Sequence, residues 1–124
     1  MNNIKKDIIV AASHYEQKYY FNPAYVGLPK TVQDELKEKI IKFAEINKCT
    51  VNLGFFPNGE MVLEAFGKEN DIYYDEISVG LKVKEFKKEE DVLLTSVYTW
   101  HEIFKTTYGA KLMEEVAESN ESEE

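Results

Sequence analysis

The chain has 124 residues, enough for one domain that buries roughly two-thirds of the surface its unfolded form exposes. With 44% hydrophobic and 31% charged residues and a formal net charge of −8, its composition is that of a globular protein and excludes an apolar-poor, disordered chain. The longest apolar run, Ile8 to Ala12, is far shorter than the ~20 residues that cross a bilayer, and no cleavable leader is evident, so we expect a cytoplasmic protein without membrane contact.

The negative charge is concentrated at the C-terminus. An acidic chain repels a phosphate backbone, which disfavours nucleic acid as a partner. We predict one domain over residues 1–113 and an acidic tail over residues 114–124. Without the six acids of this tail the net charge would be −2, so the domain itself is nearly neutral: Glu114, Glu115, Glu118, Glu121, Glu123 and Glu124.

The first predicted element is a β-hairpin. Between Ile8 and Asn22, two β-rich runs flank a polar centre, although the first run could equally open a helix. A turn at residues 27–29 then leads into a helix with Thr31 as N-cap, which ends near Asn47-Lys48. One face of this helix is expected to be buried, with apolar residues at spacings of four, four and three: Val32, Leu36, Ile40 and Phe43.

A second hairpin and two helices follow. Residues 51–55 and 61–65 alternate in polarity around Asn58-Gly59, two residues that tolerate positive φ, which strongly indicates a hairpin. A short helix is expected from Asp75 onward and another from Leu93. Their predicted apolar faces are Ile77, Leu81, Val83 and Phe86 in the first, and Leu93, Val97, Trp100 and Phe104 in the second.

The resulting order, ββαββαα, predicts an α+β fold. A small antiparallel sheet built from the two hairpins, with the helices packed on one face, would bury all these apolar stripes in two layers.

Aromatic residues are the first candidates for a binding surface. Tyrosine combines apolar area with a hydroxyl group and suits partner surfaces as well as sheet faces. The candidates lie in the first hairpin and in the last helix: Tyr15, Tyr19, Tyr20, Trp100 and His101.

The residues give no complete catalytic motif. His101-Glu102 lacks the second histidine of the zinc-protease pattern, because Lys105 stands four residues on. His101 shares a helical stripe with Val97, which favours a core or interface histidine over a catalyst. Cys49, the single cysteine, cannot form an internal disulfide and is expected to be a small buried thiol.

The acidic segment from Glu69 to Glu76 leaves a metal site open as an alternative. Carboxylates such as Asp71, Asp75 and Glu76 could hold Mg²⁺ or Ca²⁺, but the segment lacks the spacing and central glycine of a calcium loop. We favour a polar loop whose acids cap the next helix, and we expect neither a metal nor another cofactor.

The block from Ser13 to Asn22, SHYEQKYYFN, resembles a family of small uncharacterised bacterial proteins, a domain of unknown function. Gly27-Leu28-Pro29, Tyr74-Asp75-Glu76-Ile77 and Gly80-Leu81-Lys82 extend the resemblance over nearly the whole chain except the tail. The chain departs from the family pattern at Ser78 and at Lys48-Cys49, where glycines are expected. The resemblance implies a compact bacterial cytoplasmic domain standing alone and brings no assigned activity, cofactor or catalytic residue.

Three functional hypotheses follow. The abundant tyrosines favour a non-enzymatic binding or protein-interaction module, acting on a protein partner or on a second copy of itself. The alternative is a small enzyme or metal-dependent ligand binder that uses the Asp71, Asp75 and Glu76 carboxylates in a shared cleft. A third hypothesis, nucleic-acid binding, would use a local basic cluster that neighbouring acids offset: Lys82, Lys84, Lys87 and Lys88.

Overall fold

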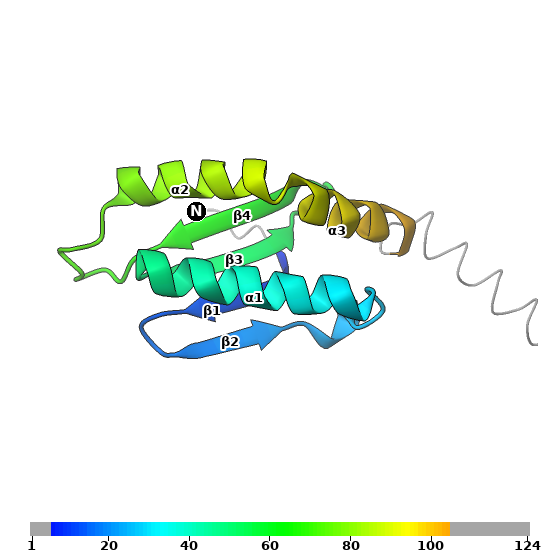
Figure 1. The fold of residues 1–124 in the computed structure, drawn as a ribbon, viewed down its shortest axis with the longest axis horizontal. Coiled ribbons are helices and arrows are strands. Elements are labelled where there is room, and N and C mark those ends of the chain that lie inside the picture. The colour runs from blue at the N-terminus through cyan, green and yellow to red at the C-terminus, as the bar shows by residue number, and fades with distance from the viewer. Residues whose placement is uncertain (1–5, 105–124) are drawn as a thin grey trace, which may run out of the picture.

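The structure is a computed structural model that describes residues 6–104, and it confirms the predicted α+β fold (Figure 1). The predicted acidic tail, residues 114–124, lies outside the described residues. In chain order the elements are β1 (Asp7–Ser13), β2 (Lys18–Phe21), a turn of 3₁₀ helix η1 (Pro23–Tyr25), α1 (Lys30–Asn47), β3 (Thr50–Phe55), β4 (Met61–Phe66), α2 (Glu76–Glu89) and α3 (Asp91–Phe104).

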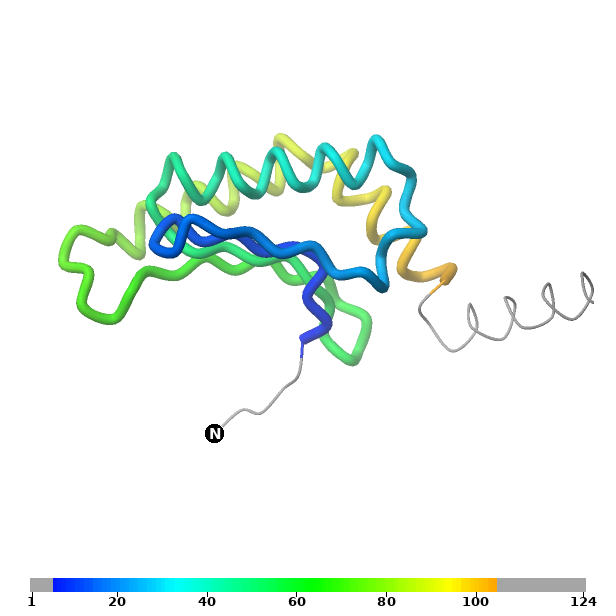
Figure 2. The backbone as a smooth tube through the Cα atoms, turned by 90° about the horizontal axis from the view of Figure 1, so that it is seen from below, coloured from blue at the N-terminus to red at the C-terminus, as the bar shows by residue number. Residues whose placement is uncertain are grey.

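The four strands form one antiparallel sheet in the order β2-β1-β3-β4. All three helices lie on one face of this sheet (Figure 2), as predicted, and no described element covers the other face. The core between the layers is formed by the helix-facing residues of the central strands together with one face of α1. Its fully buried members include Val10, Val51, Leu53, Leu36 and Ile40.

The central strands β1 and β3 approach closely where β1 is bulged. Their pairing shifts between Ile8 and Val10, so Ile9 is an extra residue, and both Ile9 and Val10 are fully buried. Gly54 pairs with Ile8, and a Cβ atom at Gly54 would lie 2.6 Å from the Asp7 carbonyl oxygen. A glycine is therefore required at this point of the sheet.

We predict that Gly54→Ala lowers the free energy of unfolding by about 2 kcal/mol, because backbone atoms of β1 would have to move. Gly80→Ala is the matched control: a Cβ there would have no neighbour within 4 Å, and alanine is the better helix former by about 0.8–1 kcal/mol. Urea unfolding should place the two midpoints on opposite sides of the wild-type value. A Gly54→Ala midpoint equal to that of the wild type would contradict the close approach.

The turn between β3 and β4 uses positive φ at one residue only. Gly59 has φ of 91° and its N–H donates to the Phe56 carbonyl (2.9 Å), while the Phe56 N–H donates to the Glu60 carbonyl (2.9 Å). The side chain of Asn58 instead accepts from the Glu60 N–H (3.0 Å). The predicted hairpin is confirmed, with the turn tightened by an asparagine side chain and a left-handed glycine.

Helix α1 begins at Lys30, so the predicted N-cap at Thr31 is wrong. Pro29 holds the cap position with φ of −51°, and its carbonyl accepts the first helical hydrogen bond from the Gln33 N–H (3.0 Å). The Gln33 side chain then donates Nε2 to the carbonyls of Val26 and Leu28 (2.9 and 2.8 Å), which fixes the entry loop against the helix.

The C-terminus of α1 carries a strained residue. Lys48 has φ of 50° and ψ of 56°, and the following N–H, of Cys49, donates to the Ala44 carbonyl (3.1 Å) as in a Schellman motif. This left-handed position favours glycine, because a Cβ atom there costs about 1–2 kcal/mol. The structure thus explains why a glycine is expected at this end of the helix.

We predict that Lys48→Gly raises the free energy of unfolding by about 0.5–1 kcal/mol, since it removes the left-handed strain at a small cost in unfolded-chain entropy. Lys48→Ala keeps the Cβ atom and removes only the charged side chain, so it should leave stability nearly unchanged. Thermal and urea unfolding of both variants separates backbone strain from charge. Equal effects of the two substitutions would assign the change to the lysine side chain instead.

The apolar face predicted for α2 is partly wrong. Of the predicted residues, Phe86 is buried and Val83 partly buried, whereas Ile77 and Leu81 are 80% and 59% exposed. Val79 is buried instead. Asp75 caps the helix through hydrogen bonds from the Ile77 and Ser78 N–H groups (both 3.1 Å). The expectation that an acid in this segment caps the helix is confirmed. Helix α3 buries Leu93 and Val97 as predicted and partly buries Trp100, whereas Phe104 of the predicted face is exposed.

Candidate functional sites

Two hollows lie at opposite ends of the molecule. Helix α1 runs the length of the structure, with α3 beside its first half, while the β1–β2 turn, the loop before α2 and the last turn of α1 meet at the other end (Figure 1). One hollow is mainly apolar and lies between α1 and α3; we call it the groove. The other contains several polar side chains and lies beside the β1–β2 turn; we call it the polar pocket.

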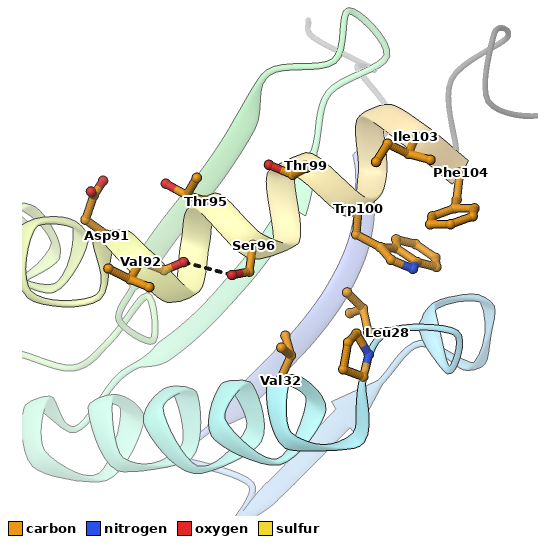
Figure 3. Close-up of a pocket in the computed structure, with 11 residues that line it drawn as sticks. Leu28, Val32, Asp91, Val92, Thr95, Ser96, Thr99, Trp100, Ile103 and Phe104 are labelled. Atoms are coloured by element: carbon orange, nitrogen blue, oxygen red, sulfur yellow. Dashed lines mark hydrogen bonds between the residues drawn. The ribbon is translucent and has the colours of Figure 1, made fainter.

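The groove has a volume of about 580 Å³ and is formed where the start of α1 faces the length of α3 (Figure 3). Val92, Ile103 and Phe104 are 81%, 42% and 37% exposed, an unusual display of large apolar side chains on one helix. Three hydroxyl-bearing residues of α3 and one acid also line it. The full lining is Leu28, Pro29, Val32, Asp91, Val92, Thr95, Ser96, Thr99, Trp100, Ile103 and Phe104.

Trp100 is held in the groove by aromatic contacts. Its ring lies 5.5 Å from that of Tyr25 and 5.3 Å from that of Phe104. A Cβ atom at Gly27 would come within 3.0 Å of the indole, so the glycine of the entry loop admits the ring. Trp100, one of the candidate binding residues, therefore lies in a preformed, mainly apolar site.

His101 points to the other side of α3. It is buried, with its ring stacked on Phe55 at a centroid distance of 3.6 Å and an interplanar angle of 11°. This position agrees with the interpretation of His101 as a core histidine.

The polar pocket, with a volume of about 510 Å³, brings together residues that are far apart in sequence. The hydroxyl of Tyr15 donates to Asp71 Oδ2 (2.7 Å), and Asp71 Oδ1 accepts from the Tyr73 N–H (3.0 Å). Lys68 Nζ lies 5.7 Å from the centroid of the Tyr15 ring. The lining is His14, Tyr15, Ile46, Asn47, Lys48, Asp71, Tyr73, Tyr74, Asp75, Ser78 and Val79.

Hydrogen bonds and burial determine which side chains of the polar pocket are ionised at neutral pH. The Tyr15 hydroxyl, with the Tyr73 N–H, lowers the pKa of Asp71, so this carboxylate stays ionised at neutral pH. Burial raises the pKa of Tyr15 and of Tyr74, which remain neutral donors. Tyr74 lies so close to Gly67 that a Cβ atom there would be 2.3 Å from the ring. The pocket wall is therefore fixed by backbone as well as by side chains.

Cys49 lies fully buried beneath this end of the sheet, which agrees with its interpretation as a buried thiol. Burial raises the pKa of its thiol to about 11, so it is protonated and a poor nucleophile at neutral pH.

We predict that Tyr15→Phe lowers the melting temperature at pH 7, because Asp71 loses its side-chain donor. Asp71 has a lowered pKa in the folded protein, so its contribution is complete above its ordinary value of 3.8 and is lost as the pH falls through the folded value. The difference between Tyr15→Phe and wild type should therefore shrink below about pH 3.8. Melting curves from pH 7 to pH 2 provide the measurement, with Tyr20→Phe as a control on an exposed strand residue. A difference that is independent of pH would assign the effect to packing.

The structure brings only some of the other candidate residues together. Tyr19 and Tyr20 follow one another in β2 and pair with Ala12 and Ala11, so they lie on opposite faces of the sheet, apart from Tyr15. Asp71 and Asp75 share the polar pocket, but Glu76 does not line it. Among residues 6–104 no group of three or more His, Cys, Asp or Glu side chains could hold a metal ion.

One lysine of the basic cluster of α2, Lys82, has an acidic partner in space as well as in sequence. Lys82 Nζ lies 3.2 Å from Glu85 Oε2, and Glu90 at the end of α2 pairs with Lys39 of α1 (3.2 Å).

The described helices include none that is long and apolar enough to cross a bilayer.

A family model described as a family of unknown function, DUF6145, matches residues 6–109. The chain belongs to this family. The match spans both hollows and every described element, and it confirms the resemblance to a domain of unknown function. Comparison with curated proteins and with solved structures finds no match to either.

Sequence reasoning identified Trp100 and Tyr15 through their aromatic character, but it missed the partners that turn them into sites. The Gly27-Leu28-Pro29 segment predicts only a turn, and Asn47-Lys48 predicts only the end of a helix. The sequence signals at these positions come from the family resemblance, which includes Gly27-Leu28-Pro29 and has glycine where this chain has Lys48-Cys49.

Proposed function

We propose that this protein is a non-enzymatic interaction module whose groove binds an amphipathic, basic helix of a protein partner. The observation that carries the proposal is that three exposed apolar side chains of α3, Val92, Ile103 and Phe104, line a space of about 580 Å³ between α3 and the start of α1. Helix-in-groove recognition uses such a surface, with apolar anchors at helical spacing entering a preformed hollow.

Charge favours a basic partner over a second acidic copy of the chain. Asp91 is the one charged residue among the described residues of the groove, and no basic side chain lines this hollow to offset it. Two copies would bring like charges together, whereas a basic segment would be attracted to the groove and could pair with Asp91. We further propose that the protein acts in the bacterial cytoplasm, which is consistent with a single, buried and reduced thiol.

Binding of a basic amphipathic helix should be visible in Trp100, the only tryptophan of the chain. We expect a designed Leu/Lys helical peptide to change its fluorescence saturably at 150 mM salt, and a matched Leu/Glu peptide to leave it unchanged. Ile103→Lys should weaken binding at least tenfold, because it places a charge in the apolar wall. Ile77→Lys, an exposed apolar residue of α2 outside the groove, is the matched control.

Equal affinity of the Ile103→Lys and Ile77→Lys variants for the basic peptide would overturn the groove as the binding surface. Sedimentation at several concentrations tests the self-association version. A dimer that Ile103→Lys dissociates would place a second copy in the groove and would overturn the basic partner.

A further inference from the structure

We propose that the polar pocket is a second, independent binding site, which takes the alkylammonium group of a small organic amine. It lies at the far end of α1 from the groove and shares no lining residue with it. The inference rests on the pairing of two carboxylates with a wall of aromatic rings in one hollow of about 510 Å³.

The carboxylates retain capacity to accept hydrogen bonds. Asp75 uses Oδ1 to cap α2, and its Oδ2 accepts from no group of the described residues. Asp71 receives one bond at each oxygen, from Tyr15 and from the Tyr73 backbone, and an ionised carboxylate can accept about four. A primary ammonium group carries three donors and a positive charge, and therefore matches these acceptors.

The aromatic wall adds attraction for a cation. His14, Tyr15, Tyr73 and Tyr74 all line the pocket, and the rings of His14 and Tyr15 meet edge to face at 5.8 Å. The Tyr15 ring already interacts with an ammonium group of the protein, since Lys68, which does not line the pocket, has its Nζ 5.7 Å from the ring centroid. The negative face of a tyrosine ring favours such a charge.

Lys48 opposes cation binding and thereby supplies a sensitive test. It lines the pocket with its side chain exposed, and its charge repels an incoming ammonium group. Removal of this charge should strengthen binding, whereas removal of either carboxylate should weaken it. General attraction of cations to an acidic protein would give a change of similar size wherever a charge is removed, so a change at Asp75 or Lys48 that is larger than the change at a distant acid distinguishes a local site.

The first measurement is an NMR and calorimetric titration with putrescine, a primary diamine, at 150 mM salt, which screens interactions with the acidic surface. We expect saturable shifts of the Tyr15, Tyr73 and Ser78 amides. Asp75→Asn should weaken binding about tenfold, and because asparagine caps helices as well as aspartate, the fold is retained. Lys48→Ala should tighten binding two- to threefold, and Glu38→Gln, on the exposed surface of α1, should change it less than twofold.

Choline distinguishes the contribution of the carboxylates from that of the aromatic rings, because its quaternary ammonium group has no N–H to donate to a carboxylate. We expect choline to bind at least tenfold more weakly than putrescine, and equal affinities would overturn the assignment of the carboxylates as hydrogen-bond acceptors. The site itself is overturned if Asp75→Asn behaves like Glu38→Gln, or if the shifts map to surfaces outside the polar pocket. Both results leave the groove unaffected, since no residue is shared.

Discussion

The pairing of β1 with β3 is the constraint on which both sites depend. At one end of β1, the Asp7 carboxylate accepts a hydrogen bond from the Tyr25 hydroxyl, and Asn22 Nδ2 donates to the Ile8 carbonyl (2.9 Å). These bonds fix η1, from which the chain passes to the entry loop of the groove. The groove therefore takes its position from the bulged end of the central strand pair, where Gly54 allows the two backbones to meet.

The other end of the same strand pair supports the polar pocket. Ser13 Oγ lies 3.1 Å from Thr50 Oγ1 across the pair, and the His14 N–H donates to the Cys49 carbonyl (3.0 Å). Together these contacts fix the β1–β2 turn against the end of α1, and so they place Tyr15 within reach of Asp71. A disturbance of the central register would consequently affect both hollows, although they share no side chain.

Periodicity predicted the layers well because the helices lie on one face of the sheet only. Residues 51–55 and 61–65 alternate in polarity for this reason, although in the central strand β3 all residues from Val51 to Phe55 are buried. Helix α1 shows a regular apolar stripe since it lies across the core. In α2 the same reasoning favoured Ile77 and Leu81, which are exposed. Apolar residues cover much of the circumference of this short helix, so spacing alone could not decide which of them face the sheet.

The sites were less predictable because they are made by contacts across the chain. Tyr15 and Asp71 were singled out for different hypotheses, one as an interaction surface and one as a metal ligand, yet they form one hydrogen-bonded pair. The two residues are 56 positions apart in the sequence, and no local sequence pattern indicates that their side chains meet. In the same way, Trp100 was recognisable as an aromatic anchor, whereas Leu28 and Pro29 become part of its groove only through the packing of η1 and α1.

The break between α2 and α3 separates the groove, which α3 lines, from the polar pocket, which the start of α2 lines. The two helices follow one another along α1, and the junction at Glu90 is pinned to the middle of α1 by Lys39 (Figure 1). Phe86 of α2 also packs edge to face on Phe43 of α1, with ring centroids 5.6 Å apart. These contacts hold α1 against α2 and its junction with α3. Toward each end of α1, loop residues line part of a hollow beside the helices. In the groove, α3 exposes apolar side chains, whereas at the other end the loops place carboxylates beside aromatic rings. This difference is the physical basis for assigning the two hollows to different ligands.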